Sequence, residues 1–503
     1  MRKIRWWPLV AIVVLWATAS LWTWFVWDAE QNQERVLRGF AQSAVALLLA
    51  LLWLLFLSRA RWKVRLAGLG TVVALIAGCV GLFEYRGVTG DLVPVFGFRW
   101  AGGPEARLSS AAASAADYPQ FLGPQRNGVV PGVRLARDWK ARPPRLVWRR
   151  AVGEGWAGFA VAAGVAYTFE QKGPEEVVAA YELASGRPLW AHGEAARHET
   201  PIGGIGPRSV PTVEGGRVLA MGATGRLRAL DAATGRLLWS RDVLAEHQAV
   251  APEWGKSCSP LVVDGRVIVS AGGPNGHSLV AYDAATGELA WRGGDDRSGF
   301  SSPLLAEIAG VRQVLIFNQA SVAGHDPADG RLLWDFPWPN AQPNVSQPLP
   351  LPGDRLFASS GYGVGGKLLQ LERDAAGNLA PKLLWESPRL KAKFTNVVAH
   401  GGRLYGLDDG TLVCLDPETG ERCWKEGRYG HGQVILAGDL LLVQAEDGQV
   451  ALVEPDPGGL KELGRFTALD GKTWNPPALA SPYLLVRNDR EAACYELGMD
   501  EAL

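Results

Sequence analysis

The residues best suited to bind a ligand are aromatic, basic and amide side chains that recur at one position of a repeated pattern. Each stands just before a short apolar segment, at the point where loops would converge on one mouth of a channel. This mixture suits an anionic or planar ligand, or a peptide segment. The same side chains could instead satisfy the backbone of their own loops. The candidates are Trp156, Arg208, Lys256, Phe300, Asn344, Gln347, Lys393, Asn396, Arg428, His431, Gln433, Trp474 and Asn475.

Three other patterns carry weaker chemistry. The segment 361–368 resembles a phosphate-binding loop, but Leu368 replaces the magnesium-binding Ser or Thr, and strand-like segments flank it. It is therefore interpreted as a glycine-rich turn. Cys414 and Cys423 flank the turn at 417–420 and would lie opposite each other in a simple hairpin register, which leaves a disulfide and two separate thiols both open. The seven histidines lack ligand spacing, so no metal site is predicted.

Composition restricts the class of protein. The 503 residues include 51 basic and 51 acidic side chains, so no overall field favours nucleic acid as a partner. Hydrophobic residues make up 48% of the chain, which is enough for a large core. Five cysteines without a C-x-x-C pair exclude a disulfide-stapled scaffold, and 61 glycines with 32 prolines indicate many turns.

A repeat defines the elements that would position these side chains. One motif recurs at intervals of roughly 40 to 50 residues, which is the length of one four-stranded propeller blade. Its copies include ALDAATGRLLW, AYDAATGELAW and CLDPETGERCW. Eight segments suited to start a blade predict eight blades. The last copy ends near Tyr495 without its closing strand, so the orphan segment 145–148 is expected to complete that blade and close the ring.

Within each copy, Asp, Thr and Gly favour a tight hairpin, because the side-chain oxygens bond nearby N–H groups and Gly permits positive φ. The final tryptophan ends the outermost strand, where it can pack against the next blade. These residues are predicted to be structural. They are Trp148, Trp190, Trp239, Trp291, Trp334, Trp385 and Trp424.

The first hundred residues differ in kind. Apolar runs at about 6–27, 40–57 and 66–83 each approach the 20 or so residues of a bilayer-spanning helix. Basic residues lie before the first run and between the second and third runs. By the positive-inside rule, the N-terminus and this second loop are expected in the cytoplasm, so the chain after the third run is expected to be exported. A cleaved signal peptide and lipidation at Cys79 are alternatives that the run lengths disfavour. The predicted organisation is a membrane anchor at 1–100, a flexible linker at 101–116 and a propeller at 117–503.

The D-x-x-T-G-x-x-x-W repeats and the lead-in DYPQFLGPQRNG (117–128) resemble pyrroloquinoline quinone (PQQ)-type eight-bladed propellers. That family includes quinoprotein alcohol dehydrogenases and the propeller lipoprotein of the outer-membrane β-barrel assembly machinery. The resemblance implies an all-β, eight-bladed propeller of four-stranded blades, here preceded by three transmembrane helices. For the dehydrogenases it also implies PQQ, a calcium held by Glu, Asn and Asp, an Asp base and a vicinal disulfide. No adjacent cysteine pair or matching acidic trio is present.

The expected function is therefore a binding or scaffold module, anchored in the inner membrane with its propeller on the periplasmic side. Its expected partner is an exported protein or a small anionic ligand, no cofactor is required, and no catalytic residue is assigned. The alternative is a membrane-linked, PQQ-dependent oxidoreductase with calcium, for which membrane glucose dehydrogenase is an architectural analogue.

Overall fold

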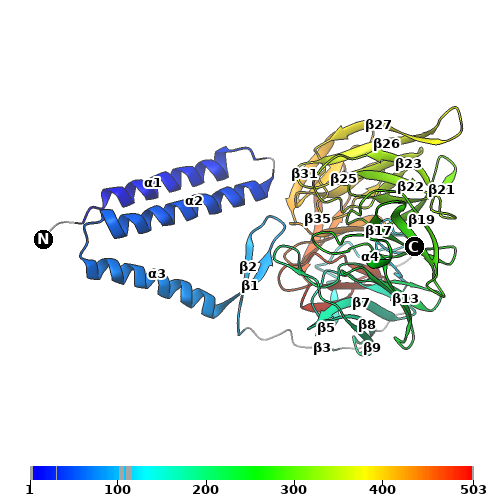
Figure 1. Ribbon diagram of the computed structural model, residues 1–503, viewed down its shortest axis with the longest axis horizontal. Coiled ribbons are helices and arrows are strands. Elements are labelled where there is room, and N and C mark those ends of the chain that lie inside the picture. Colours follow the sequence, from blue (N-terminus) through cyan, green and yellow to red (C-terminus); the bar gives the residue numbers. More distant parts are fainter. Residues whose placement is uncertain (1–3, 30, 101–106, 109–115, 501–503) are drawn as a thin grey trace. The chain divides into compact units, whose positions relative to one another are not determined.

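The computed structural model describes residues 4–29, 31–100, 107–108 and 116–500, and it divides the chain into two compact units, Met1–Gly103 and Pro104–Leu503 (Figure 1). Of the linker expected at 101–116, all but residues 107, 108 and 116 lie outside the described part of the chain. Each unit is described by itself.

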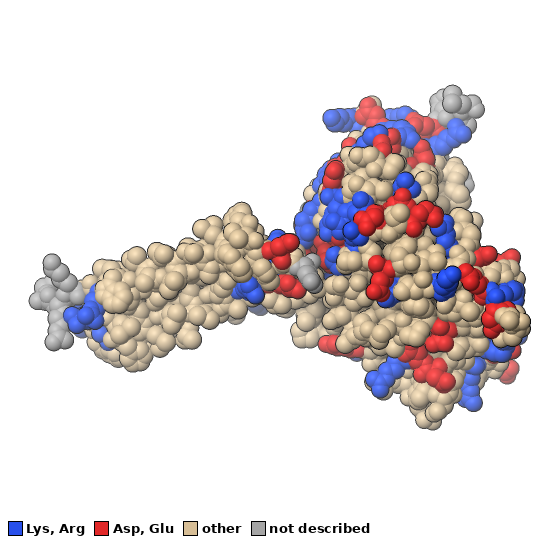
Figure 2. Space-filling model, turned by 90° about the horizontal axis from the view of Figure 1, so that it is seen from above, with Lys and Arg blue, Asp and Glu red and all other residues tan. Residues whose placement is uncertain are grey.

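The first unit contains three helices that are long and apolar enough to cross a membrane. Along them the surface is almost free of charged side chains, whereas the propeller surface mixes both signs (Figure 2). A hairpin that the sequence did not predict follows the third helix. The elements are α1 (Trp7–Leu21) with its continuation η1 (Trp22–Val26), α2 (Asn32–Leu52) with η2 (Trp53–Leu57), α3 (Trp62–Leu82), β1 (Phe83–Val88) and β2 (Pro94–Phe98).

The second unit is a propeller of eight antiparallel sheets, as the repeats predict. The first strands of neighbouring blades contact one another, so these short strands surround the central axis. Blades 1 and 2 are β6 (Ala160–Ala162), β7 (Val165–Lys172), β8 (Glu175–Glu182), β9 (Pro188–Ala195); β12 (Thr212–Glu214), β13 (Arg217–Met221), β14 (Arg226–Asp231), β15 (Leu237–Asp242). Between or beside them lie β10 (Glu199–Thr200), β11 (Gly204–Ile205) and α4 (Val243–Glu246).

The middle blades repeat this pattern without added strands. Blades 3 and 4 are β16 (Leu261–Val263), β17 (Arg266–Gly273), β18 (His277–Asp283), β19 (Leu289–Gly293); β20 (Leu304–Ile308), β21 (Val311–Phe317), β22 (Ser321–His325), β23 (Leu332–Pro337). Blades 5 and 6 are β24 (Leu349–Leu351), β25 (Arg355–Ser360), β26 (Gly365–Arg373), β27 (Leu379–Ser387); β28 (Val398–His400), β29 (Arg403–Asp408), β30 (Thr411–Leu415), β31 (Arg422–Arg428).

The last two blades each gain a strand from the beginning of the domain. In blade 8, β5 pairs with β38 over Arg145–Glu496 to Ala151–Glu491, which confirms the predicted closure of the ring. Blade 7 is β32 (Gln433–Ala437), β33 (Leu440–Gln444), β34 (Gln449–Glu454), β35 (Lys461–Thr467) and β4 (Val129–Val130). Blade 8 is β36 (Ala478–Ala480), β37 (Tyr483–Arg487), β38 (Glu491–Glu496), β5 (Arg145–Ala151) and β3 (Arg107–Leu108).

All but one of the repeat tryptophans join their blade to the next one. The Trp239 indole donates to the carbonyl of Ala284 at 3.1 Å and lies over Gly287, where an added Cβ would meet the ring at 2.6 Å. The glycine of the repeat is thus required both by its φ of 73° and by the neighbouring indole. Trp334 departs from this pattern, because its indole donates instead to Gln313 of its own blade.

The Cys414–Cys423 register expected from the sequence is wrong. Cys414 lies opposite Trp424, and a β-bulge leaves Cys423 without a cross-strand partner residue. The same bulge precedes this turn in the other blades, for example between Ala229 and Leu230. Both thiols are free, Cys414 buried and Cys423 exposed. The bulge brings Trp424, and not Cys423 before it, opposite Cys414 of the third strand β30.

The lead-in segment crosses the centre of the propeller. Its Tyr118 exchanges two main-chain hydrogen bonds with Val161 of blade 1. The segment then continues to β4, which pairs in parallel with β32 of blade 7. Between these points the guanidinium of Arg126, 2% exposed, donates to three main-chain carbonyls of blades 3 and 4. Those carbonyls belong to Ser259, Pro260 and Pro303. The lead-in therefore plugs the channel and ties opposite blades together.

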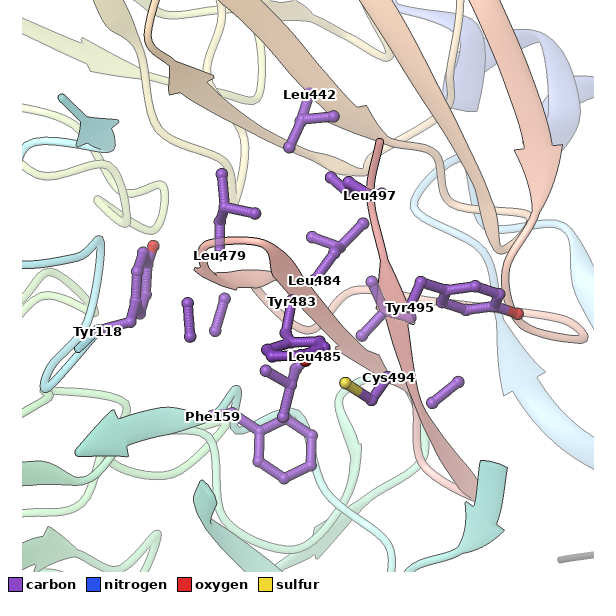
Figure 3. Close-up of a cluster of buried hydrophobic side chains, with 14 of the residues drawn as sticks. Tyr118, Phe159, Leu442, Leu479, Tyr483, Leu484, Leu485, Cys494, Tyr495 and Leu497 are labelled. Atoms are coloured by element: carbon purple, nitrogen blue, oxygen red, sulfur yellow. The ribbon is translucent and has the colours of Figure 1, made fainter. Parts of the chain in front are cut away.

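The largest core cluster lies where blade 8 meets the lead-in and blade 1 (Figure 3). Tyr483 and Leu485 of β37 and Cys494 of β38 pack there with Phe159 of blade 1 and Tyr118 of the lead-in. Closure of the ring thus buries a continuous apolar core, and it holds the loops before the inner strands at fixed positions around the axis.

Candidate functional site

A pocket of about 180 Å³ lies on the propeller axis above the lead-in segment. The loops before the inner strands of all eight blades contribute to it, and Phe121 of the lead-in provides part of its wall. It is lined by Phe121, Trp156, Ile202, Gly203, Arg208, Trp254, Ser257, Ser259, Phe300, Ser302, Val345, Tyr362, Phe394, Asn396, Gln433, Trp474 and Pro476.

Six of these side chains form what we call the aromatic collar: Trp156, Trp254, Phe300, Tyr362, Phe394 and Trp474. Their rings contact one another in two runs. Trp474 lies 4.8 Å from Trp156 and 5.0 Å from Phe394 between ring centroids. Trp254 lies 5.5 Å from Phe300 and 6.3 Å from Tyr362. Trp156 and Trp474, which stand before the inner strands of blades 1 and 8, are therefore neighbours across the seam of the ring.

Two lysines lie against the collar. The Nζ of Lys472 is 4.3 Å from the ring centroid of Trp474 and 4.7 Å from that of Trp156. The Nζ of Lys393 is 4.7 Å from the ring of Tyr362. Cation–π attraction favours the charged ammonium groups at these sites. Burial opposes the charge, and it lowers the pKa of Lys472 below its ordinary value despite nearby Asp489 and Glu446.

Arg208 is the charged member of the pocket lining. Among the described residues that line the pocket, no other carries a formal charge. Its guanidinium donates to main-chain carbonyls, including that of Gly203 at 2.7 Å and that of Gly204 at 3.3 Å. Burial lowers its pKa to about 10, with Glu176 acting in the opposite direction. The group thus remains a cation at neutral pH, held by dipoles rather than by a carboxylate in contact.

The predicted amides mainly join neighbouring blades. Asn475 donates to carbonyls of blade 1, and Gln433 to carbonyls of the loops that start blades 6 and 8. Asn396 accepts from the main-chain N–H of Gln347 in blade 5 at 2.9 Å. Asn344 donates to carbonyls of the turn between β21 and β22. Gln433 and Asn396 also reach the pocket, so these amides both fix the ring and line its centre.

Seven of the sequence candidates do not line the pocket: Lys256, Asn344, Gln347, Lys393, Arg428, His431 and Asn475. Lys256 is 1% exposed, and its Nζ donates to the carbonyl of Ala271 at 3.2 Å. Arg428 is exposed at the end of the outer strand β31. His431 is buried behind Phe394, with 5.3 Å between the ring centroids. Spacing located their loops correctly, but the direction of each side chain depends on packing that spacing does not encode.

The sequence reasoning missed three rings of the collar and the lysine that covers two of its indoles. Lys472 stands two residues before Trp474, and Phe394 stands beside Lys393, so both belong to loops that already carried a predicted candidate. Trp254 precedes the segment that the sequence predicts to start blade 3. Tyr362 belongs to the glycine-rich turn, which the structure confirms as a hairpin between β25 and β26; its φ of 57° is of the left-handed kind.

The described residues do not match a calcium–quinone centre of the kind the resemblance implies. Among them, no group of three His, Cys, Asp or Glu side chains is arranged to hold a metal ion. The five cysteines are all separate in sequence and are free. The collar could stack on a planar group, but the polar atoms that accompany it are Arg208, Asn396 and Gln433 rather than an acidic ligand set.

The fold is shared with solved propellers of low sequence identity. The structure of BamB from Moraxella catarrhalis is 18% identical over 72% of this chain and 99% of its own, with a TM-score of 0.52. A europium-containing methanol dehydrogenase is 14% identical over 76% of this chain and 98% of its own, with a TM-score of 0.57. No curated protein matches the chain. These likenesses show the fold alone.

A family model extends the agreement to the sequence itself. The model described as outer membrane protein assembly factor BamB matches residues 174–426 and 375–493. These ranges together span the last two strands of blade 1, blades 2 to 6, blade 7 apart from β4, and blade 8 as far as the first half of β38. They include the repeat tryptophans from Trp190 to Trp424 and every collar residue except Trp156. The chain therefore belongs to the propeller family described as outer membrane protein assembly factor BamB.

Proposed function

We propose that this protein is a membrane-anchored binding module that holds a partner protein at the centre of its propeller. The partner would place a planar apolar side chain, flanked by a carboxylate, into the pocket. The observation that carries this proposal is the aromatic collar around Arg208. Six rings supply the apolar contact, and the guanidinium supplies the charge.

The electrostatics favour an anionic group. The described hydrogen bonds of Arg208 go to main-chain carbonyls, so its positive charge has no carboxylate in direct contact. Lys393 and Lys472 add positive charge behind the rings. A carboxylate that enters a desolvated pocket forms stronger charge-assisted hydrogen bonds than it would at the surface. Binding should therefore select acidic over basic ligands and weaken as salt rises.

A second cavity supports a peptide rather than an isolated small molecule. It has a volume of about 670 Å³ and shares Trp254 and Phe300 with the central pocket. Its other walls include the loop that carries Val250, whose side chain is 84% exposed, and the loop around Arg297. A chain held at the centre could therefore continue outward over blades 3 to 5. The shared rings would contact it on both sides.

The membrane anchor completes the proposal. The basic residues before α1 and between α2 and α3 place those segments in the cytoplasm by the positive-inside rule. The propeller would then work outside the cytoplasm, attached to the inner membrane. Anchoring raises the local concentration of the pocket near that membrane, which suits a partner that is exported or embedded there.

The alternative function is a PQQ-dependent oxidoreductase, and the observation that favours it is the cluster of aromatic rings in the collar, which could contact a planar quinone. It is tested by adding PQQ and calcium to the purified protein and measuring dye reduction with alcohols or sugars. We expect no substrate-dependent reduction. Turnover that a chelator abolishes would replace the binding module with the enzyme.

The binding proposal is tested by photo-crosslinking in native membranes. A benzophenone amino acid is placed at Tyr362 in the collar and, as a matched control, at Leu332 on the outer strand of blade 4, which is 42% exposed. We expect a protein adduct at position 362 alone, mapping to a segment with acidic and aromatic residues and diminished by Arg208→Gln. Identical adducts at both positions, or none at 362, would contradict the proposal.

A further inference from the structure

The hairpin that follows α3 presents one face made of aromatic side chains. In its register Phe83 lies opposite Phe98 and Tyr85 lies opposite Phe96, so alternation places these four rings on the same face. Trp100 extends the row, with its ring 5.4 Å from that of Phe98. All five side chains are between 42% and 65% exposed in the first unit. Such a row of exposed rings is unusual for a surface in contact with water.

Both ends of the hairpin are fixed to the ends of apolar helices. Strand β1 begins at Phe83, directly after the last residue of α3. At the base, the main-chain N–H of Arg99 donates to the carbonyl of Leu82 at 3.0 Å, and its guanidinium donates to the carbonyl of Val80 at 3.1 Å. At the turn, Asp91 accepts from the Asn32 side chain, at the start of α2, at 3.0 Å.

These attachments determine the depth of the hairpin. The end of α3 and the start of α2 lie at the same membrane boundary if both helices span the bilayer, because each crosses it once in opposite directions. A hairpin held at both points stays at that boundary. The same end of the helical unit carries Trp22 and Trp27, with the Arg38 guanidinium 3.7 Å from the ring centroid of Trp27. Tryptophan and arginine are typical of the headgroup region.

We propose that the aromatic face of the β1–β2 hairpin inserts into the headgroup region of the bilayer that α1–α3 span. The occupant of this face is lipid, because the face continues directly from a membrane-spanning helix and its residues are those that prefer the interface. Glu84 lies between Phe83 and Tyr85 in sequence, so it points to the opposite, aqueous face. This inference rests on the helices spanning a membrane and not on the ligand of the pocket.

The hairpin has a consequence for the anchor as a whole. The chain that follows α3 would be held at the membrane surface as a two-stranded hairpin, because hydrogen bonds join this hairpin to α3 and to α2. The chain would therefore leave the interface near Trp100 and not at Leu82. Interfacial anchoring of this kind limits tilt and rotation of the helices to which it is bonded.

Site-directed spin labelling tests this placement in the full-length protein in lipid nanodiscs. The exposed thiols are removed by Cys79→Ser and Cys423→Ser, and a nitroxide is attached through Phe96→Cys or, as a control on the other face, Glu84→Cys. Collisions with oxygen, which enriches in lipid, are compared with collisions with a water-soluble nickel chelate. We expect the oxygen-to-nickel ratio to be at least several-fold higher at position 96 than at 84.

Two results would overturn the proposal. Equal nickel accessibility at both positions would place the aromatic face in water. Shielding of position 96 from oxygen and nickel alike would show that a protein surface covers it. A label introduced by Phe98→Cys repeats the measurement two residue pairs away on the same face, so a local disturbance by one label does not decide the outcome.

Discussion

At the scale of single residues, the propeller interior holds cations on main-chain carbonyls. Arg126 and Lys256 are both buried, and their hydrogen bonds go mainly to main-chain carbonyl oxygens, those of Arg126 in the loops before β16 and β20 and that of Lys256 in β17. Burial lowers the pKa of Arg126 to about 10 and that of Lys256 to about 8. A buried cation with one carbonyl contact is costly in its charged form, so Lys256 should weaken the fold at neutral pH.

We predict that Lys256→Met stabilises the protein at pH 7. Between pH 8 and 10.5 the folded protein releases this proton while the unfolded chain keeps it, so wild-type stability rises with pH and the advantage of the variant shrinks. The difference in unfolding free energy should fall by about 3 kcal/mol across this range. Urea unfolding in detergent at pH 8 and at pH 10.5 measures this difference, and Lys140→Met at an exposed position is the control. Parallel pH curves for wild type and Lys256→Met would refute the effect of burial.

The site could be predicted in part at this scale. The sequence located the loops, because one motif fixes where each blade starts, and Trp156, Arg208 and Trp474 line the pocket as expected. The sequence did not predict that the Lys256 side chain points into the core, or that Lys472 lies over the indoles of two tryptophans. Neighbouring positions in a loop point in different directions, and only the packing of the closed ring decides which side chain faces the axis.

At the scale of elements, a contact that recurs around the ring joins neighbouring blades: the indole of one blade packs against the turn of the next. Gly287→Ala forces a Cβ to within 2.6 Å of the Trp239 ring, whereas Gly265 in the same blade has a similar φ and nothing within 4 Å. We predict that Gly265→Ala costs about 1 kcal/mol through φ alone. Gly287→Ala should cost about 1 to 3 kcal/mol more through overpacking. Equal losses in denaturant unfolding would show that the indole contributes nothing to this requirement.

Ring closure depends on β5. Trp148 is fully buried and donates to the carbonyl of Leu183 at 2.7 Å, so Trp148→Ala should cost about 3 to 5 kcal/mol. Deletion of residues 141–150 should lower solubility sharply, because it exposes the edge of β38. Thermal melting and sedimentation measure the two effects. A deletion variant that melts like the parent would show that the ring closes without this strand.

The elements followed the sequence closely, because the repeats encode turns and a docking residue in each blade. The bulge before each turn was missed, since it adds one residue to the outer strand without changing the motif. The β1–β2 hairpin was missed as well, because its alternating aromatics follow an apolar helix directly. The crossing path of residues 118–130 depends on long-range contacts that no local pattern reveals.

At the scale of the whole molecule, the chain joins three helices that could span a membrane to a closed ring with a pocket on its axis. The distribution of basic residues predicts its orientation. A reporter that is active only outside the cytoplasm should be active when fused after residue 116 and inactive when fused at residue 60. The reverse pattern of activities would place the propeller in the cytoplasm.

The measurement that tests the central claim most directly is the binding of defined peptides to the full-length protein. Fluorescence anisotropy compares a labelled peptide with one tryptophan among acidic residues, its lysine counterpart and its alanine-for-tryptophan counterpart. We predict that the acidic tryptophan peptide binds at least about tenfold more tightly than either. Its affinity should fall with salt, less so in Arg208→Gln, and Trp474→Leu should weaken it further at unchanged stability. Equal binding of all three peptides, or unchanged binding by both variants, would contradict the account.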